Sequence, residues 1–430
     1  MKIVDVNPKR LDGIVDIPPS KSISHRAIIA GALSNGGSTI ENIIMSKDVK
    51  ATCDGLMSLG ADIDYRSNTD NRYTIIVRGK GRIKSNGAAI DCIESGSTLR
   101  FLIPLALISE EEIIFNGRGK LVERPLDIYY DIFQKQGINY HNKSGKLPLT
   151  VRGKLKPSDF HMRGDISSQF ITGLMFVLPL LDGDSSIIID TPLESKSYIG
   201  LTIDVLKSFG IEIYNENYKM FKIKGNQVYK PIKYRVEGDF SQAAFWLVAG
   251  TIAGNIECSD INTSSLQGDR EIIRIIQEMG GNLKIKDKSV TAYKSHTKGI
   301  EIDASQIPDL IPVLSVLACL SRGTTIIKNA SRLKLKESDR LRSITSELSK
   351  IGGRIKELKD GLIIDGVDSL NGGIVNSWND HRIAMALAVA STRCKNSLKI
   401  EGAESIDKSY PGFWEDFKKL GGDICERNMG

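Results

Sequence analysis

One short signature recurs six times along the chain at nearly constant intervals. In each copy a helix-like apolar pattern ends at a glycine, and a hydrophobic strand pattern begins directly after it. These glycines, 69 to 77 residues apart, are Gly60, Gly137, Gly210, Gly280, Gly352 and Gly421. A glycine in the left-handed conformation commonly ends a helix, and even spacing over a whole chain indicates an internal structural repeat. The sequence therefore predicts six related units rather than six unrelated helix caps.

Each unit is expected to run strand, helix, strand, helix, strand, strand. In the first copy the periodicity predicts, in that order, 14–17, 22–33, 38–41, 48–59, 61–65 and 73–77. The sixth copy ends one strand short after Ile424, whereas residues 3–6 form a strand pattern that belongs to no copy. We therefore expect the N-terminal strand to complete the last repeat.

This closure predicts two domains of three repeats each. At 430 residues the chain exceeds the size at which one hydrophobic core keeps growing. One domain would comprise residues 13–230, and the other residues 1–12 plus 231–430, with a cleft between them. Units with two helices and four strands indicate an α/β fold rather than a short helical solenoid.

Charge and composition narrow the class of protein. Lys and Arg number 58 against 52 Asp and Glu, a mild and diffuse excess that favours anionic small molecules but lacks the basic patch of a nucleic-acid-binding protein. The six cysteines form no C-x-x-C pair, so neither zinc nor disulfides are predicted. No apolar run is long enough to span a bilayer, and the N-terminus lacks the apolar region of a signal peptide. We expect a cytoplasmic protein without membrane partners, and no association motif argues against a monomer.

The chemically informative residues cluster where helices are expected to begin. Free backbone N–H groups and the helix dipole favour anions at these points. In the N-terminal half the clusters contain Lys21, Ser22, His25, Arg26, Gly96, Arg124, Ser167, Ser168, Gln169, Ser195 and Tyr198. Basic residues in a first helical turn are unfavourable unless an anion binds there. The pattern therefore predicts a site for phosphate or carboxylate groups.

In the C-terminal half, acids join the bases at the helix starts. The residues are Asp309, Lys336, Glu337, Arg340, Arg382 and Lys408. Lys336 and Arg340 are four apart and would share one helix face, with Glu337 adjacent; alone, this spacing is also typical of a surface ion pair. The sequence contains no P-loop, complete dinucleotide-binding, nucleophile-elbow or zinc-peptidase motif, and no carboxylate–histidine cluster that predicts a metal.

Eight motifs in chain order together resemble the 5-enolpyruvylshikimate-3-phosphate synthase family, from about residue 13 to the C-terminus. They are Lys21-Ser22-x-x-x-Arg26, Ser95-Gly96-Ser97-Thr98-x-Arg100, Glu123-Arg124-Pro125, Ser167-Ser168-Gln169, Ile307-Pro308-Asp309, Lys336-Glu337-Ser338-Asp339-Arg340, Asn379-Asp380-His381-Arg382 and Lys408-x-Tyr410-Pro411-Gly412. The resemblance implies an inverse α/β barrel of the α/β (α+β) class, with two domains each of three βαβαββ repeats. The chain departs from the common pattern at Glu94, Ser197 and Arg332.

The resemblance also implies an activity. The family transfers the enolpyruvyl group of phosphoenolpyruvate to the 5-hydroxyl of shikimate 3-phosphate in the shikimate pathway of chorismate and aromatic amino-acid biosynthesis, with no cofactor or obligatory metal. Carried over by motif, the catalytic residues are Asp309 as base, Glu337 as acid, and Lys21. Shikimate 3-phosphate would contact Lys21, Ser22, Arg26, Ser167, Ser168, Gln169, Ser195, Tyr198, Asp309 and Lys336. Phosphoenolpyruvate would contact Lys21, Gly96, Arg124, Gln169, Arg340, Arg382 and Lys408.

Three other classes of protein fit these residues less well. The related UDP-N-acetylglucosamine enolpyruvyl transferases carry a loop cysteine, whereas residues 117–124 contain none, and Ser22 follows Lys21 here. The RNA 3'-phosphate cyclases require a nucleotide-accepting histidine that has no counterpart in this pattern. A noncatalytic repeat protein that binds phosphorylated ligands would have no reason to bury Asp309 and Glu337 among its cations.

Overall fold

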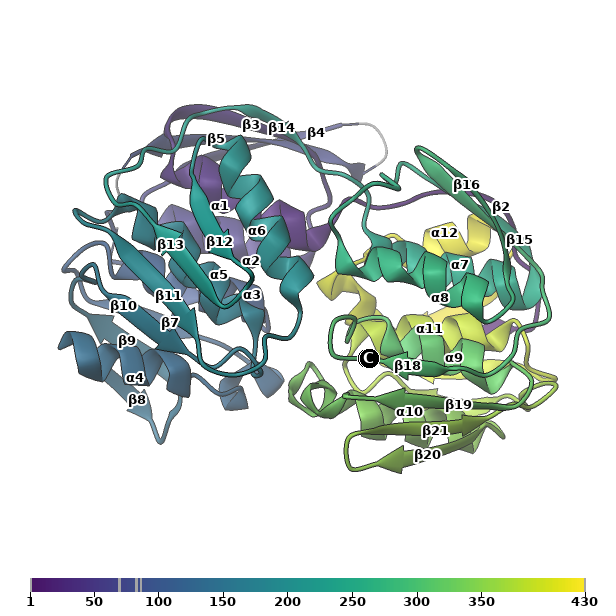
Figure 1. Cartoon of the computed structure of the whole chain (residues 1–430). Helices are drawn as coiled ribbons and strands as arrows, with labels where there is room; N and C mark the ends of the chain where they lie inside the picture. The colour runs from purple at the N-terminus through teal and green to yellow at the C-terminus, as the bar shows by residue number, and fades with distance from the viewer. Residues whose placement is uncertain (1, 69–70, 82–83, 86, 429–430) are drawn as a thin grey trace. The chain divides into compact units, whose positions relative to one another are not determined.

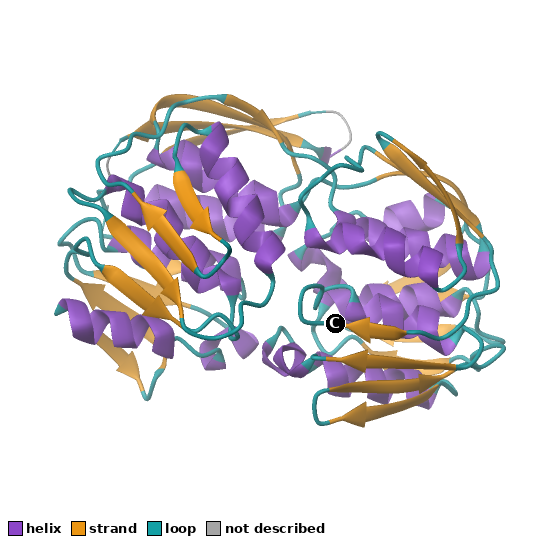
Figure 2. Ribbon diagram, viewed as in Figure 1, coloured by secondary structure: helices purple, strands orange, loops and turns teal. Residues whose placement is uncertain are grey.

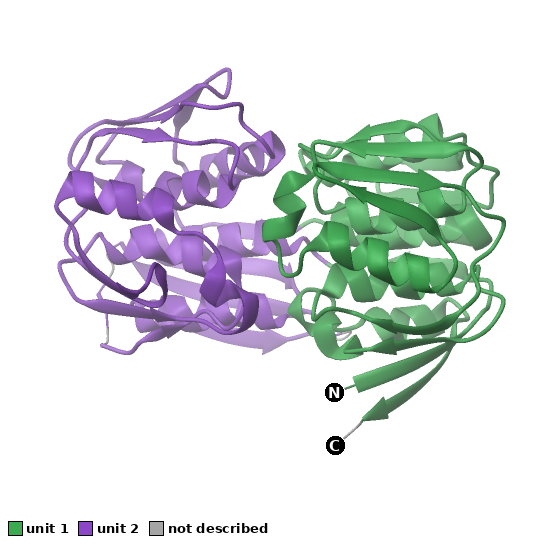
Figure 3. Ribbon diagram, turned by 90° about the horizontal axis from the view of Figure 1, so that it is seen from below, with its two compact units in different colours: residues 1–18, 237–430 green, residues 19–236 purple. Residues whose placement is uncertain are grey.

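The computed structural model describes residues 2–68, 71–81, 84–85 and 87–428. The chain forms two compact units (Figure 3). Residues 19–236 form one, here called the continuous unit, and residues 1–18 with 237–430 form the other, the discontinuous unit. The chain therefore passes between the units after residues 18 and 236, whereas the repeat pattern predicts crossings after residues 12 and 230.

The continuous unit contains three repeats (Figure 1). Its helices are α1 (Lys21–Leu33), α2 (Lys47–Ser58), α3 (Gly96–Ala106), α4 (Asp127–Gln136), α5 (Ser168–Val177) and α6 (Lys196–Ser208). Its strands are β3 (Asn35–Ile43), β4 (Asp62–Ser67), β5 (Tyr73–Lys80), β6 (Ile90–Asp91), β7 (Ile113–Asn116), β8 (Asn139–Lys143), β9 (Lys146–Arg152), β10 (Asp159–Met162), β11 (Ser185–Ile189), β12 (Ile213–Glu216), β13 (Met220–Ile223) and β14 (Lys233–Arg235).

The discontinuous unit repeats the same plan. Its helices are α7 (Phe240–Ala253), α8 (Ile272–Glu278), α9 (Ile311–Cys319), α10 (Arg340–Lys350), α11 (His381–Ser391) and α12 (Phe413–Lys419). Its strands are β1 (Lys2–Asn7), β2 (Asp12–Asp16), β15 (Asn255–Ser259), β16 (Asn282–Lys286), β17 (Ser289–Tyr293), β18 (Glu301–Asp303), β19 (Thr324–Lys328), β20 (Arg354–Leu358), β21 (Gly361–Asp365), β22 (Gly373–Asn376), β23 (Leu398–Glu401) and β24 (Asp423–Asn428).

The described strands form six four-stranded sheets with one shared topology. The orders are β14-β3-β5-β4, β6-β7-β9-β8 and β10-β11-β13-β12 in the continuous unit, and β2-β15-β17-β16, β18-β19-β21-β20 and β22-β23-β1-β24 in the discontinuous unit. In each sheet the first pair is parallel and the rest antiparallel, as in β6-β7-β9-β8. The parallel strands β6 and β7 are joined through α3, and the antiparallel strands β8 and β9 are joined by a tight turn. The βαβαββ repeat predicted from the sequence is confirmed.

The ends of the chain close the last repeat as expected. β1 pairs with both β23 and β24, so the first strand of the sequence stands where the missing sixth-copy strand was predicted. Figure 3 shows the two termini emerging side by side from this sheet. The six signature glycines also have the predicted left-handed backbone, with φ between +67° and +94°.

One strand assignment of the first copy is wrong. Residues 14–17 were expected to begin the first sheet, but β2 pairs in parallel with β15 in the discontinuous unit. The vacated position beside β3 is taken by β14. The two chain crossings thus exchange the first strands of the first and fourth repeats. Strand periodicity is a local pattern that does not identify the partner, which explains the error.

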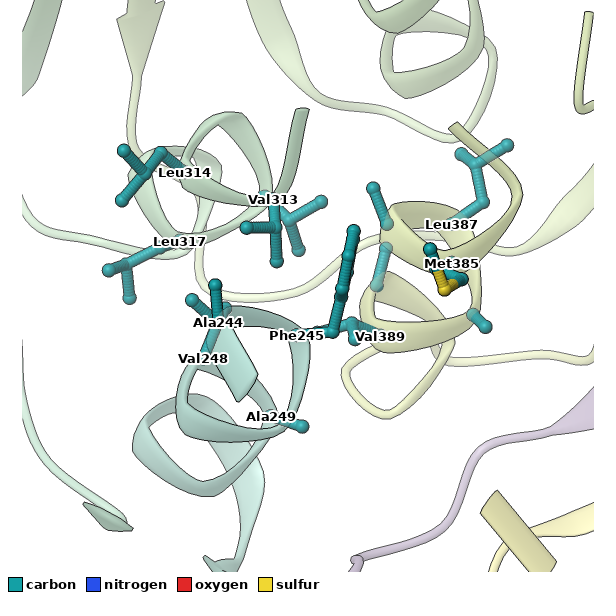
Figure 4. Packing of buried hydrophobic residues seen from close by; sticks show 14 of the residues in the cluster. Ala244, Phe245, Val248, Ala249, Val313, Leu314, Leu317, Met385, Leu387 and Val389 are labelled. Atoms are coloured by element: carbon teal, nitrogen blue, oxygen red, sulfur yellow. The ribbon is translucent and has the colours of Figure 1, made fainter. Parts of the chain in front are cut away.

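The first helix of each repeat lies inside its unit, and the sheets lie further out (Figure 2). The first helices of the repeats in the discontinuous unit, α7, α9 and α11, are buried along their whole length, which their all-round apolar sequences favour. Phe245 of α7 lies among Val313 of α9 and Val389 of α11, with an exposed fraction of 0% (Figure 4). None of the described helices has the length and apolar character that a membrane crossing requires.

Truncation at this three-helix contact should destabilise the discontinuous unit selectively. Phe245→Ala is expected to lower the free energy of unfolding of this unit by about 3–5 kcal/mol, because removal of the ring leaves a cavity between three buried helices. The chain has three tryptophans, Trp246, Trp378 and Trp414, and all belong to this unit, so urea unfolding followed by tryptophan fluorescence measures it directly. Phe245→Leu, which keeps most of the volume, should lose far less. Equal losses for both variants would contradict this account.

Candidate active site

In the continuous unit, the start of α1 is anchored by two cations, the partly buried Lys21 and the buried Arg26. Lys21, the first residue of the helix, places its Nζ 2.8 Å from Asp48 Oδ2. Arg26 donates to the Ser22 carbonyl at 2.7 Å and to the Tyr198 carbonyl at 3.1 Å, so it ties α1 to α6. Burial lowers the pKa of Arg26 to about 10, with Tyr198 acting in the opposite direction, and the group stays charged at neutral pH. The structure thus brings these predicted ligands together.

At the start of α3, the absence of a side chain at Gly96 gives room to the guanidinium of Arg124. Gly96 is the first residue of the helix, and a Cβ built there would lie 2.5 Å from Nη1 of Arg124 and 3.5 Å from Oε1 of Gln169. Gln169, at the start of α5, donates to Ser97 Oγ at 2.9 Å. Predicted residues from three segments therefore meet at one helix N-terminus, which favours anions.

Arg100 belongs to this cluster but was not assigned a role from the sequence. Arg100 is 5% exposed, and its guanidinium donates to Gln169 Oε1 at 2.7 Å and lies 4.9 Å from the centre of the Phe170 ring. The hydrogen bond from Arg100 to the amide oxygen of Gln169 fixes the orientation of that amide group. The signal was present, because Arg100 ends one of the motifs that carry the family resemblance.

The remaining predicted ligands of the continuous unit also stand at helix starts. Ser167 caps α5 and accepts from the Gln169 backbone N–H at 3.3 Å, and Ser168 follows as the first helical residue. Ser195 precedes α6 with φ of 55°, a left-handed conformation that few serines adopt. Both helix starts therefore present serines at the positive end of a helix dipole.

His25 does not belong to the anion site. It is fully buried, and its Nδ1 lies 2.7 Å from Thr52 Oγ1. Burial lowers its pKa well below the usual range, and the charges of Lys21 and Arg26 lower it further. His25 is therefore a neutral core residue.

In the discontinuous unit, one guanidinium gathers three carboxylates. Arg340 is 1% exposed and donates to Asp309 Oδ1 at 2.7 Å, to Glu337 Oε2 at 2.7 Å and to Asp380 Oδ2 at 2.8 Å. Burial alone would lower the pKa of Arg340, but the Asp380, Glu337 and Asp309 carboxylates outweigh it and raise the pKa above the ordinary value. Arg340 is permanently charged.

Two more predicted cations face the same aspartate. Lys336 Nζ lies 3.5 Å from Asp309 Oδ1, and Arg382 Nη2 lies 3.4 Å from Asp309 Oδ2. Arg382 also donates to the Asp309 carbonyl at 3.2 Å. Burial lowers the pKa of Lys336, opposed by Asp309 and reinforced by Arg340. Asp309 is therefore the centre of a cationic cluster.

Lys336 and Arg340 do not share a helix face, contrary to the expectation from their spacing. α10 begins at Arg340, and Asp339 caps it by accepting from the Arg342 backbone N–H at 3.1 Å. Lys336 precedes the cap in an extended conformation. The two cations meet because both pair with Asp309, which lies two residues before α9.

Lys408 is held at the start of α11. It ends a 3₁₀ helix (Ala403–Lys408), is 8% exposed and donates to the Asn379 carbonyl at 2.6 Å. Asn379 immediately precedes Asp380, the residue that caps α11 and pairs with Arg340. The sixth predicted residue of this half is thereby linked to the Arg340 cluster.

Asp269 is a buried acid that the sequence analysis missed. It is 3% exposed, and Ser241 Oγ donates to its Oδ2. Burial raises its pKa to about 7; the Asp309 and Asp239 carboxylates act in the same direction, whereas Arg382 and the Ser241 hydrogen bond oppose the rise. No local pattern marks it, since its charged neighbours belong to other elements. A proton on Asp269 thus responds to the charge of Asp309.

Comparison with known proteins gives one family. Residues 6–417 match the family described as EPSP synthase (3-phosphoshikimate 1-carboxyvinyltransferase). Proteins named 3-phosphoshikimate 1-carboxyvinyltransferase from Clostridium novyi (strain NT) and Clostridioides difficile (strain 630) are 55% and 50% identical to this chain, with 100% of both chains covered.

Solved structures give the same fold. An EPSP synthase from Acinetobacter baumannii superimposes with a TM-score of 0.82 at 23% identity, covering 100% of both chains. The enolpyruvyl transferase NikO from Streptomyces tendae gives 0.81 at 17% identity, covering 100% of this chain and 99% of that one. The predicted inverse α/β barrel is confirmed.

The buried acid predicts a pH dependence of stability. The pKa of Asp269 rises from an ordinary 3.8 to about 7 on folding, so the native state binds more protons across that window and stability falls as pH rises through it. Asp269→Asn cannot ionise and should escape this loss. The free energy of unfolding of Asp269→Asn, relative to that of the unmodified protein, should therefore increase by roughly 1–3 kcal/mol from pH 5 to pH 8.

Thermal unfolding at the two pH values measures this difference. Asp182→Asn, at an exposed position in the continuous unit, is the matched control and should show the same pH dependence as the unmodified protein. An Asp269→Asn variant whose unfolding midpoint follows pH just as the control does would contradict the buried-acid assignment.

Proposed function

Because this chain belongs to the EPSP synthase (3-phosphoshikimate 1-carboxyvinyltransferase) family, we propose that it transfers the enolpyruvyl group of phosphoenolpyruvate to the 5-hydroxyl of shikimate 3-phosphate. The products are 5-enolpyruvylshikimate 3-phosphate and inorganic phosphate. The observation that carries the proposal is the cluster of Asp309 and Glu337 around the buried Arg340, because it puts proton-transfer groups among cations that can bind an anionic substrate. We further propose that the enzyme acts as a cytoplasmic monomer.

The continuous unit is proposed to hold shikimate 3-phosphate and the phosphate of phosphoenolpyruvate. Serine hydroxyls at the starts of α5 and α6, where the helix dipole is positive, suit the 3-phosphate, and Ser22 with Arg26 suits the shikimate carboxylate. Arg124 beside Gly96 suits the transferable phosphate, with Lys21 adding a second charge. These roles explain why so many cations lie at helix starts, where they would otherwise be unfavourable.

Arg340 and Arg382 are proposed to clamp the phosphoenolpyruvate carboxylate. A guanidinium matches a carboxylate with two parallel hydrogen bonds, which orients the substrate. In the structure, Asp309 engages both guanidinium groups. A substrate carboxylate would compete with it and free Asp309 to act as a base.

The proposed reaction uses the two acids in opposite directions. Glu337 donates a proton to the methylene carbon of phosphoenolpyruvate, and a cationic centre develops at C2. The 5-hydroxyl oxygen attacks C2 while Asp309 accepts the hydroxyl proton. In the resulting intermediate the Glu337 carboxylate takes back a methyl proton while the C–O bond to phosphate breaks, and the enol ether and inorganic phosphate leave. Lys21 and Lys408 stabilise the negative charge of the departing phosphate.

Phosphate release from defined substrates tests the function. Purified protein with shikimate 3-phosphate and phosphoenolpyruvate should release phosphate, and replacing shikimate 3-phosphate with UDP-N-acetylglucosamine should abolish the release. Turnover with the sugar nucleotide and silence with shikimate 3-phosphate would instead assign the sister enzyme. Silence with both, while phosphorylated ligands still bind, would favour a noncatalytic binding protein.

Glu337→Gln should separate binding from chemistry. The amide keeps the size of the side chain but cannot supply the proton, so kcat should fall by roughly 10²–10⁴-fold while the Kd for shikimate 3-phosphate changes little. Stopped-flow or steady-state phosphate release with calorimetric binding measures both. Glu357→Gln, at a partly exposed site paired with Lys334, is the matched control and should keep normal turnover. An unchanged kcat in Glu337→Gln would refute its role as the acid.

A further inference from the structure

Glu347 is a buried carboxylate that no sequence motif and no step of the proposed reaction uses. It lies in α10 with an exposed fraction of 0%. Oε1 accepts from Trp378 Nε1 at 2.7 Å, and Oε2 accepts from the Asn376 backbone N–H at 2.9 Å. Lys350, one turn further along α10, donates to both oxygens at 2.8 Å. A buried carboxylate is costly unless it is satisfied in this way, so the site is specific.

The two loop donors belong to the segment 376–380, which joins β22 to α11. Trp378 and Asn379 have φ of 54° and 53°, so two consecutive residues other than glycine adopt the left-handed region. This backbone is unfavourable and persists only where its surroundings hold it. On the side of α10, the loop is held by the hydrogen bonds that Asn376 and the Trp378 side chain donate to Glu347. On the opposite side, it is held by Ser377 Oγ, which donates to the Gly402 carbonyl at 2.8 Å.

The far end of this loop carries two contacts of the proposed phosphoenolpyruvate site. Asn379 accepts from Lys408 Nζ at 2.6 Å through its carbonyl. Asp380 accepts from Arg340 Nε at 2.8 Å and caps α11 by accepting from the Arg382 backbone N–H at 3.0 Å. The backbone conformation of this one loop thus sets where three cations stand.

We propose that Glu347 is a positioning residue for phosphoenolpyruvate: through Asn376 and Trp378 it fixes the 376–380 loop, and the loop fixes Lys408, Arg340 and Arg382. The proposal rests on the proposed function, because it takes these cations as phosphoenolpyruvate ligands. A carboxylate that only stabilised α10 would need no partner beyond Lys350. Its bonds to the loop are what connect it with the binding of this substrate.

Steady-state kinetics of Glu347→Gln test the proposal. The amide group can replace only some of the acceptor sites, so at least one loop donor loses its partner. The KM for phosphoenolpyruvate should rise by roughly tenfold or more, as expected for loss of a hydrogen bond to a charged group. The kcat should change less than threefold, and the Kd for shikimate 3-phosphate should not change. Trp378→Phe, which removes the indole N–H donor but keeps a smaller aromatic ring, should raise the same KM.

Lys350→Met is the matched control, because it removes the partly exposed partner of Glu347 and leaves both loop contacts. It should keep the KM of the unmodified enzyme. If Glu347→Gln and Trp378→Phe lower the thermal midpoint but leave the KM for phosphoenolpyruvate unchanged, Glu347 is merely structural and the inference fails. If Glu347→Gln does not fold, Trp378→Phe alone decides between these results. An unmodified protein that releases no phosphate would instead refute the proposed function, and the inference with it.

Discussion

The buried guanidinium of Arg340 is the interaction on which the discontinuous unit's half of the site depends. It joins Asp309 before α9, Glu337 before α10 and Asp380 at the cap of α11, which are three segments far apart in sequence. A charged group that is only 1% exposed must be paired, and removal of Arg340 would leave buried carboxylates without their counter-charge. The three loops are therefore held in one arrangement by a single side chain, and the other cations, Lys336 and Arg382, take their places around Asp309.

The same interaction couples binding to chemistry in the proposed reaction. While Asp309 and Glu337 neutralise Arg340, their oxygens are engaged as hydrogen-bond acceptors and the cationic site is internally satisfied. A substrate carboxylate that replaces one of them at Arg340 supplies the same unit charge, so the guanidinium remains paired while the displaced acid becomes available for proton transfer. Binding energy is then used to release catalytic groups rather than to tighten the ground-state complex.

The features of this protein that the sequence predicts are those that depend on residues close together along the chain. The helix-ending glycines, the βαβαββ order and the closure by β1 all follow from periodicity and spacing. The exchange of β2 and β14 was not predictable, because neither strand's own residues identify its partner. Asp269 and Glu347 escaped for a related reason: their roles come from donors and charges on other elements. The prediction that Lys336 and Arg340 share a helix face is wrong because Asp339 caps α10, so the helix begins only after Lys336.

The six repeats share a topology but differ at their helix caps, and this difference divides the chemistry. In the continuous unit the caps of α3 and α5 are Ser95 and Ser167, and neither helix has an acid in its first turn, so the positive helix ends are uncompensated. In the discontinuous unit the caps of α7, α10 and α11 are Asp239, Asp339 and Asp380, carboxylates that already neutralise those ends. Anion binding at the serine caps can use backbone N–H groups directly, whereas at the aspartate caps it must rely on Lys and Arg side chains. Those cations need counter-charges when no ligand is bound, and Asp309 and Glu337, the acids proposed for proton transfer, provide them.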